Sequence, residues 1–135
     1  SKEIMIHLKV EVKGEPDVPP FTRVFEHGDK ADEQIFFNSV DMIKEKLVRN
    51  LKINTNEALL VYCAYIVNEL RSRKSKNIIE KNVSKILSTH NVMIGVPETL
   101  RKITFEATID DLPKEVIIFE KPIPVSDYIL ASEQR

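Results

Sequence analysis

Apolar and polar side chains alternate along the first segment of the chain. Residues 3–13 carry an apolar side chain at every second position, at Ile4, Ile6, Leu8, Val10 and Val12. A period of two over this length is typical of a β-strand with one buried face. Gly14 and the three prolines that follow it predict a loop, since proline fixes φ and lacks a backbone donor. Residues 21–25 are then expected to form a short return strand.

The period lengthens to between three and four residues from about residue 32. Apolar residues recur on one helical face as far as Leu51, at Phe36, Val40, Ile43 and Leu47. This spacing predicts an amphipathic helix. Asp32 and Glu33 stand at its start and basic residues towards its end, which matches the polarity of the helix dipole.

A second helix is predicted after Asn54, because Asn54-x-x-Glu57 resembles a capping box. Residues 58–67 are apolar on every side of that helix, which indicates burial all round. In so small a protein we expect a partner chain to supply part of this burial. A third helix is predicted from about Lys76 to Ser88, with four inward apolar residues: Ile79, Val83, Ile86 and Leu87.

Strands return near the C-terminus. Residues 103–109 alternate again, residues 110–113 read as a turn, and residues 115–120 form the return strand of a β-hairpin. The predicted order is a strand-rich N-terminal extension, three helices and a C-terminal β-hairpin. That order defines an α+β fold rather than alternating β and α units.

Composition narrows the function classes. The 135 residues suffice for one domain with its own core, and 20 basic residues nearly balance 21 acidic ones. A net charge of -1 argues against a dedicated nucleic-acid binder. The single cysteine allows no internal disulfide, which suits the cytoplasm. No signal peptide and no apolar run of ~20 residues is visible, so no membrane span is expected. Three glycines leave no room for a glycine-rich phosphate loop.

No group of residues has the pattern of a catalytic or metal site. Cys63 lies in the most apolar helix, where a thiol is usually an inert packing residue. His7, His27 and His90 each lack a His, Cys or paired carboxylate three or four residues away. We therefore predict no catalytic, cofactor-binding or metal-binding residue on this chain.

Two charged segments also have ordinary structural explanations. Asp110 and Asp111 are adjacent on a predicted turn, where Asp is common and neighbouring side chains point apart. The basic residues between 71 and 76 could contact phosphate, but no aromatic residue lies among them: Arg71, Arg73, Lys74 and Lys76. Nucleic-acid binding through this segment stays a minor hypothesis.

Four short motifs, in order and correctly spaced, resemble the urease gamma subunit family over residues 38–123. The first is Leu51-Lys52-Ile53-Asn54-x-x-Glu57-Ala58, similar to the family's L-K-L-N-Y-P-E-A. The second, residues 92–98, is similar to V-M-E-G-V-P-E. The third and fourth are Ile103-x-x-Glu106-Ala107-Thr108 and the ending Lys121-Pro122-Ile123. The chain departs from the family at Ile94, where Glu is usual, and at the hairpin turn, where the family has P-D-G-T.

The resemblance implies an urease gamma-like helical bundle with a C-terminal β-hairpin at residues 38–124. Residues 1–37 would be an N-terminal β extension and residues 125–135 a C-terminal tail. It further implies a non-catalytic structural subunit of a nickel-dependent urease, a hydrolase that converts urea to ammonia and carbamate. The nickel would be bound by the large alpha subunit, and the partners would be the alpha and beta subunits in a threefold assembly.

Two alternatives remain open. The chain could be a stand-alone protein–protein interaction module derived from the urease gamma fold, whose extra strand pairs with another sheet edge. It could also be a small nucleic-acid-binding domain that uses residues 71–76, in which case binding would depend steeply on salt.

Overall fold

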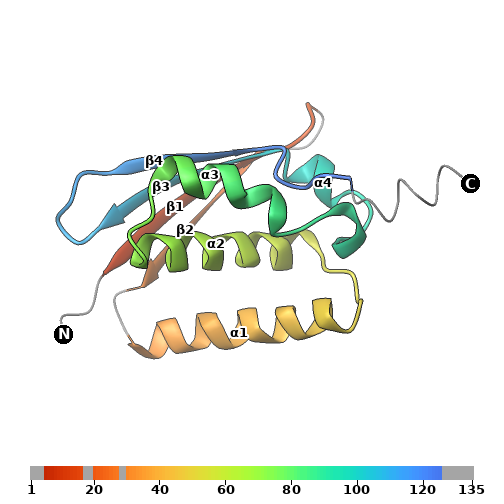
Figure 1. Cartoon of the computed structure of the whole chain (residues 1–135), viewed down its shortest axis with the longest axis horizontal. Helices are drawn as coiled ribbons and strands as arrows, with labels where there is room; N and C mark the ends of the chain where they lie inside the picture. The colour runs from red at the N-terminus through yellow and green to blue at the C-terminus, as the bar shows by residue number, and fades with distance from the viewer. Residues whose placement is uncertain (1–4, 17–19, 28–29, 126–135) are drawn as a thin grey trace, which may run out of the picture.

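The computed structural model describes residues 5–16, 20–27 and 30–125. Four strands form one antiparallel sheet in the order β2-β1-β3-β4 (Figure 1). They are β1 (Ile6–Lys13), β2 (Phe21–His27), β3 (Lys102–Ile109) and β4 (Glu115–Glu120). The predicted return strand and the predicted hairpin are both confirmed. The two pairs join because β1 lies between β2 and β3, so the N-terminal strands extend the sheet of the C-terminal hairpin.

The period of two in β1 places its apolar residues on one face of the sheet. Ile6, Leu8, Val10 and Val12 are buried, while His7 and Glu11 on the other face are exposed. The largest buried side chains of the sheet come from its C-terminal hairpin, Phe105 from the central strand β3 and Phe119 from the edge strand β4. An antiparallel sheet with one packed and one solvated face shows this alternation.

The helices cover the apolar face of the sheet. They are α1 (Lys30–Val48), α2 (Thr55–Arg71), α3 (Lys76–Asn82) and α4 (Val96–Thr99), with short 3₁₀ turns at Val83–Lys85 and Thr89–Asn91. The first helix ends three residues before Leu51, because Asn50 adopts a left-handed conformation with φ of 59°. The third predicted helix divides into α3 and a 3₁₀ turn, and of its four inward residues Ile86 alone is not fully buried. The α+β class is as predicted.

Helix α2 is the central helix, lying between α1 and the sheet (Figure 1). Nine of its residues are buried: Ala58, Leu59, Val61, Tyr62, Cys63, Ala64, Ile66, Val67 and Leu70. The chain's own sheet and helices supply this burial, so the expectation that a partner chain would supply part of it is wrong. Two layers pack against opposite sides of α2, and a helix in that position must be apolar all round.

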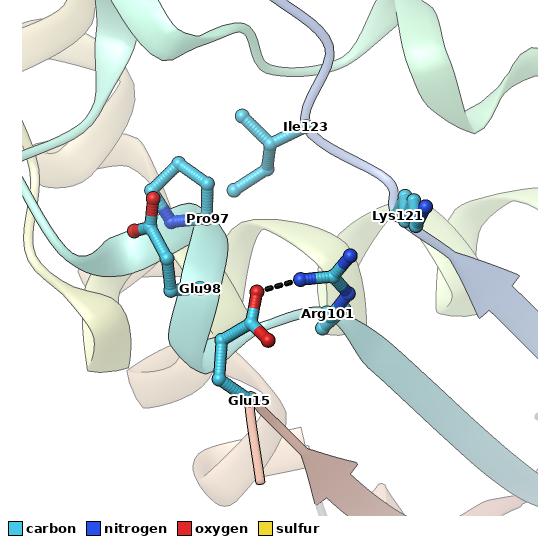
Figure 2. A pocket seen from close by; sticks show the side chains of 6 residues that line it. All are labelled: Glu15, Pro97, Glu98, Arg101, Lys121 and Ile123. Atoms are coloured by element: carbon cyan, nitrogen blue, oxygen red, sulfur yellow. Dashed lines mark ion pairs between the residues drawn. The ribbon is translucent and has the colours of Figure 1, made fainter. Parts of the chain in front are cut away.

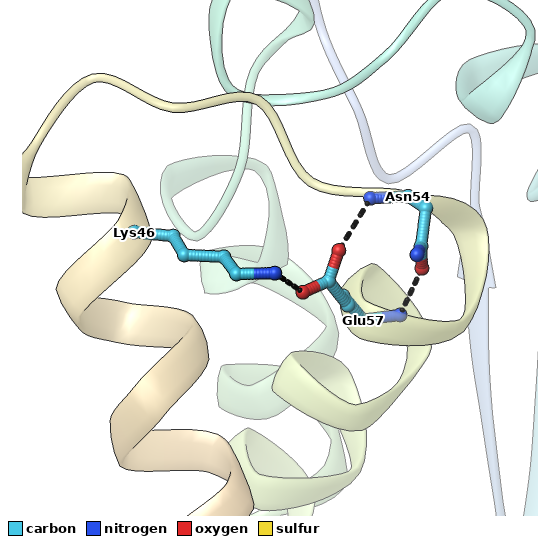
Figure 3. A network of polar contacts seen from close by, with 3 residues as sticks. All are labelled: Lys46, Asn54 and Glu57. Atoms are coloured by element: carbon cyan, nitrogen blue, oxygen red, sulfur yellow. Dashed lines mark hydrogen bonds and ion pairs between the residues drawn. The ribbon is translucent and has the colours of Figure 1, made fainter.

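The predicted capping box holds the start of α2 (Figure 3). The Asn54 side chain accepts a hydrogen bond of 2.8 Å from the Glu57 N–H, and the Asn54 N–H donates to Glu57 Oε1 at 3.0 Å. Lys46 of α1 binds the second oxygen of Glu57 at 2.6 Å. Burial by itself would raise the pKa of Glu57, but the hydrogen bonds from Lys46 and Asn54 and the Lys46 charge bring it below its usual value. One carboxylate thus caps α2 and ties it to α1.

Candidate docking surface

The residues that sequence reasoning weighed for chemistry do not converge. Cys63 is completely buried in α2, and burial raises the pKa of its thiol. His7 is exposed on the outer face of β1, and His90 is half-buried in the 3₁₀ turn before residue 92. His27 ends β2. Within the described ranges no three His, Cys, Asp or Glu side chains gather in a way that could hold a metal ion.

The two charged segments have structural partners. Asp110 begins the β3–β4 turn with φ of 48°, and its carboxylate accepts a hydrogen bond of 2.9 Å from the Met5 N–H. Asp111 is exposed on the same turn. In the basic segment, Arg71 pairs with Glu33 of α1, and Lys74 pairs with Glu69 at 3.1 Å. Two of the four cations are therefore already matched by carboxylates, which weakens the case for a phosphate site.

The family-like motif at residues 92–98 forms a surface loop whose two ends are anchored in the core. Val92 and Val96 are each only 3% exposed. Val92 forms a parallel bridge with Ile53, in which Met93 N–H donates to the Ile53 carbonyl at 2.9 Å. The anchored ends fix the backbone of the residues between them.

Between these anchors two apolar side chains point away from the core. Ile94 is fully exposed and Met93 is 46% exposed. Gly95 follows with φ of 94°, a conformation that residues with a side chain rarely adopt, and its carbonyl accepts from both the N–H and the hydroxyl of Thr99. The left-handed Gly95 turns the chain into α4, so the Met93–Ile94 pair is displayed at a sharp, hydrogen-bonded corner.

Two hollows flank this corner. One, of about 290 Å³, lies beside Met93 and Ile94 and is bounded by Lys52 and Pro97. The other, of about 180 Å³, is shown in Figure 2, where the carboxylate of Glu15 points towards Arg101 and pairs with it. Pro97 lines both hollows. We call residues 92–98 together with these two hollows the 92–98 surface.

The end of β1 packs directly against this surface. Glu15 N–H donates to the Glu98 carbonyl at 2.9 Å. A Cβ on Gly14 would lie 2.8 Å from the Glu98 carbonyl oxygen and 2.9 Å from that of Thr99. Only a residue without a side chain permits this approach. The N-terminal extension thereby supports the motif that sequence reasoning had placed about 80 residues away.

Sequence reasoning used residues 92–98 to recognise the family but did not identify them as a surface. A signal was present: Met93 and Ile94 are consecutive apolar residues in a segment with neither a helical nor a strand period. Isolated apolar residues are normal on a protein surface, but an exposed pair on a rigid loop between two hollows is typical of a binding site.

The fold and this surface define a class: a small α+β protein that exposes an apolar pair, Met93 and Ile94, at a hydrogen-bonded corner. The pattern of the family described as "Urease, gamma subunit" matches residues 28–123. The chain is also 38% identical over 89 residues to the urease subunit gamma of Halalkalibacterium halodurans, covering 65% of this chain and 89% of that protein. The chain belongs to the urease gamma subunit family, and its role is that of a urease gamma subunit.

The matched region begins ten residues earlier than the motifs alone indicated, near the start of α1. Strands β1 and β2 precede it. No helix within the described residues is long and apolar enough to cross a membrane.

Proposed function

We propose that the chain is a non-catalytic structural subunit that packs against the large alpha subunit of a nickel-dependent urease through the 92–98 surface. The observation that carries the proposal is the position of the family-like motif. Its Val residues are buried, whereas Met93 and Ile94 between them face solvent on a rigid corner. A motif needed only for the core would place its apolar side chains inside.

The energetics support a binding role for this corner. Complete burial of one large aliphatic side chain contributes about 1.5–3 kcal/mol. Ile94 is fully exposed, so a partner could gain that full amount from it. Because the loop is hydrogen-bonded at Met93, Gly95 and Thr99, little conformational entropy is lost on binding. A single anchoring residue of this kind can dominate an interface.

The assembly that we propose contains the alpha and beta subunits of urease, threefold symmetry and a cytoplasmic location. The support is membership of the gamma subunit family. In this arrangement nickel and urea hydrolysis belong to the alpha subunit, and this chain contributes contact surface alone.

The test is reconstitution with purified urease alpha and beta subunits, read by sedimentation, nickel content and urea hydrolysis. We expect the wild-type chain to enter a complex that contains nickel, and Ile94→Asp to bind at least tenfold more weakly, since the lost burial exceeds 1.4 kcal/mol. Leu112→Asp is the matched control: it also replaces an exposed leucine-sized residue, but in the β3–β4 turn.

Failure of the wild-type chain to join the alpha and beta subunits would refute the proposal. Equal binding by Ile94→Asp and Leu112→Asp would leave the subunit role intact and refute the assignment of the 92–98 surface. Binding to a partner without nickel would instead support the stand-alone interaction module.

A further inference from the structure

The two edges of the sheet differ in how their backbone groups are satisfied. Asp110 N–H donates to the Met5 carbonyl at 2.9 Å, which continues the β1–β3 ladder beyond Ile6. Ladder bonds alternate between the two sides of an antiparallel strand. Odd-numbered residues of β1 therefore bond to β3, and its even-numbered residues bond to β2. This alternation fixes which backbone groups point outward at both edges.

At the β4 edge the outward N–H of Ile118 is covered. The same alternation directs the N–H of Ile118 away from β3. The Glu80 carboxylate of α3 accepts that N–H at 2.7 Å. A carboxylate on an outward N–H blocks the addition of another strand, which is one of the devices that protect sheet edges.

The β2 edge has no such cover within the described residues. The even-numbered residues of β1 lie opposite the odd-numbered residues of β2: Ile6 opposite His27, Leu8 opposite Phe25, Val10 opposite Arg23 and Val12 opposite Phe21. The backbone groups of these odd-numbered residues therefore bond to β1. Thr22 and Val24 therefore direct their N–H and C=O groups outward, where no described residue bonds to them. Val24 is also 56% exposed. An uncovered edge of this kind is a template for strand addition.

The surroundings of β2 supply what an added strand needs beyond backbone bonds. A hollow of about 280 Å³ lies between β2 and α2, bounded by Arg23, Asn56, Leu59 and Leu60. Its two leucines would receive an apolar side chain from the incoming strand. Arg23 donates to the neutral Asn56 amide at 3.3 Å and lies 5.6 Å from the Phe21 ring centre, but pairs with no carboxylate among the described residues. The edge thus selects a segment that carries both an apolar and an acidic residue.

A second copy of this chain does not supply that acidic residue. If two β2 strands paired about a twofold axis, residues on the same face of the sheet would lie opposite each other. The residues two and four positions from Arg23 along β2 are Phe21, Phe25 and His27. None is a carboxylate, and the register centred on Arg23 places two like charges together. The charge of this edge therefore favours a different chain over self-association.

We propose that the outer edge of β2 binds an extended, acid-containing segment of another subunit of the urease complex as a fifth strand of the sheet. This inference rests on the proposed function for the identity of the complex. It adds a second contact, remote in sequence from residues 92–98 and located on strands that precede the matched family region.

Proline at position 24 tests the edge selectively. The N–H of Val24 points away from β1, so Val24→Pro removes an outward donor without removing a ladder bond, and proline is tolerated at such edge positions. Val24→Ala is the matched control, because it shortens the side chain but keeps the N–H. Arg23→Glu reverses the charge expected to attract the incoming segment. Thermal unfolding of each variant checks that it is folded.

The binding experiment uses purified urease alpha and beta subunits with the full chain. We expect amide exchange at Thr22 and Val24 to slow on complex formation, Val24→Pro and Arg23→Glu to bind about tenfold or more weakly, and Val24→Ala to bind as wild type. Unchanged exchange at β2 in a complex that does form, or equal binding by all variants, would overturn the strand-addition proposal while the subunit role stands.

Two other outcomes would also overturn the proposal that β2 binds a strand of another subunit. If the wild-type chain forms no complex with the alpha and beta subunits, both the proposed function and this inference are overturned. If the wild-type chain alone sediments as a dimer that Val24→Pro converts to a monomer, the edge binds a second copy, and the choice of a different subunit is refuted. The exchange measurement on the wild-type complex needs no variant, so misfolding of Val24→Pro would not prevent a decision.

Discussion

Two tyrosines on neighbouring turns of α2 provide a test in which the same substitution has opposite effects. Tyr62 is completely buried, and its hydroxyl has no hydrogen-bond partner among the described residues. Tyr65 is only half-buried, and its hydroxyl donates to the Ile79 carbonyl at 2.8 Å. Both rings lie near Phe119, with centroids 5.8 and 6.1 Å away. Replacing each tyrosine by phenylalanine therefore changes one hydroxyl in a shared aromatic cluster.

The expected magnitudes follow from the state of each hydroxyl. An unsatisfied buried polar group costs about 1–3 kcal/mol, so Tyr62→Phe should raise the free energy of unfolding by about that amount. Tyr65→Phe removes a hydrogen bond worth about 1 kcal/mol and should lower it. For a chain of this length 1 kcal/mol corresponds to roughly 3–5 °C in Tm. We expect Tyr62→Phe to melt several degrees above the wild type and Tyr65→Phe several degrees below it.

Urea unfolding at neutral pH, followed by far-UV circular dichroism, gives the free energy, and thermal unfolding gives Tm. The slope of the urea transition should stay the same in both variants, because neither changes the surface exposed on unfolding. A Tyr62→Phe variant that is less stable than the wild type would refute the reasoning. It would mean that the Tyr62 hydroxyl is bonded in solution, for instance to a buried water.

Three further predictions concern single residues. Gly14→Ala should lower Tm and speed amide exchange at Glu98, because the new Cβ would lie 2.8 Å from the Glu98 carbonyl oxygen; unchanged exchange there would contradict the close packing. The pKa of Glu57 is lowered, so its contribution to stability is present above pH 4.5 and is lost as pH falls; the stability difference between wild type and Glu57→Gln should shrink on acidification, and a constant difference would refute this. Burial raises the pKa of Cys63, so the free energy of unfolding should fall more steeply with pH above 9.0 in the wild type than in Cys63→Ala. Rapid labelling of the native thiol at neutral pH would contradict its burial.

Local patterns in the sequence were sufficient for the strands and the first three helices in their order, but they did not indicate the four-residue helix α4. The alternation in residues 3–13 and 103–109 gave β1 and β3, because a strand repeats every two residues whatever its partner. The capping box at Asn54 gave the start of α2, since its bonds join residues three apart. Family motifs of three to eight residues gave the urease gamma relationship, which the comparisons confirm. All these signals lie within a short stretch of chain.

Tertiary structure alone decided how those elements combine. The sequence presented the N-terminal strands and the C-terminal hairpin as separate features, because nothing local says that β1 pairs with β3 across almost 100 residues. The same pairing makes β2 an edge and brings Gly14 against Glu98. It was also tertiary packing, with α1 and the sheet on opposite sides of α2, that buried the all-apolar helix without a partner chain. Long-range pairing depends on the sum of many weak contacts between distant segments, and no single segment contains that information. The sequence by itself therefore determined the helices and strands, whereas the tertiary structure determined the exposed sheet edge and the surface at residues 92–98.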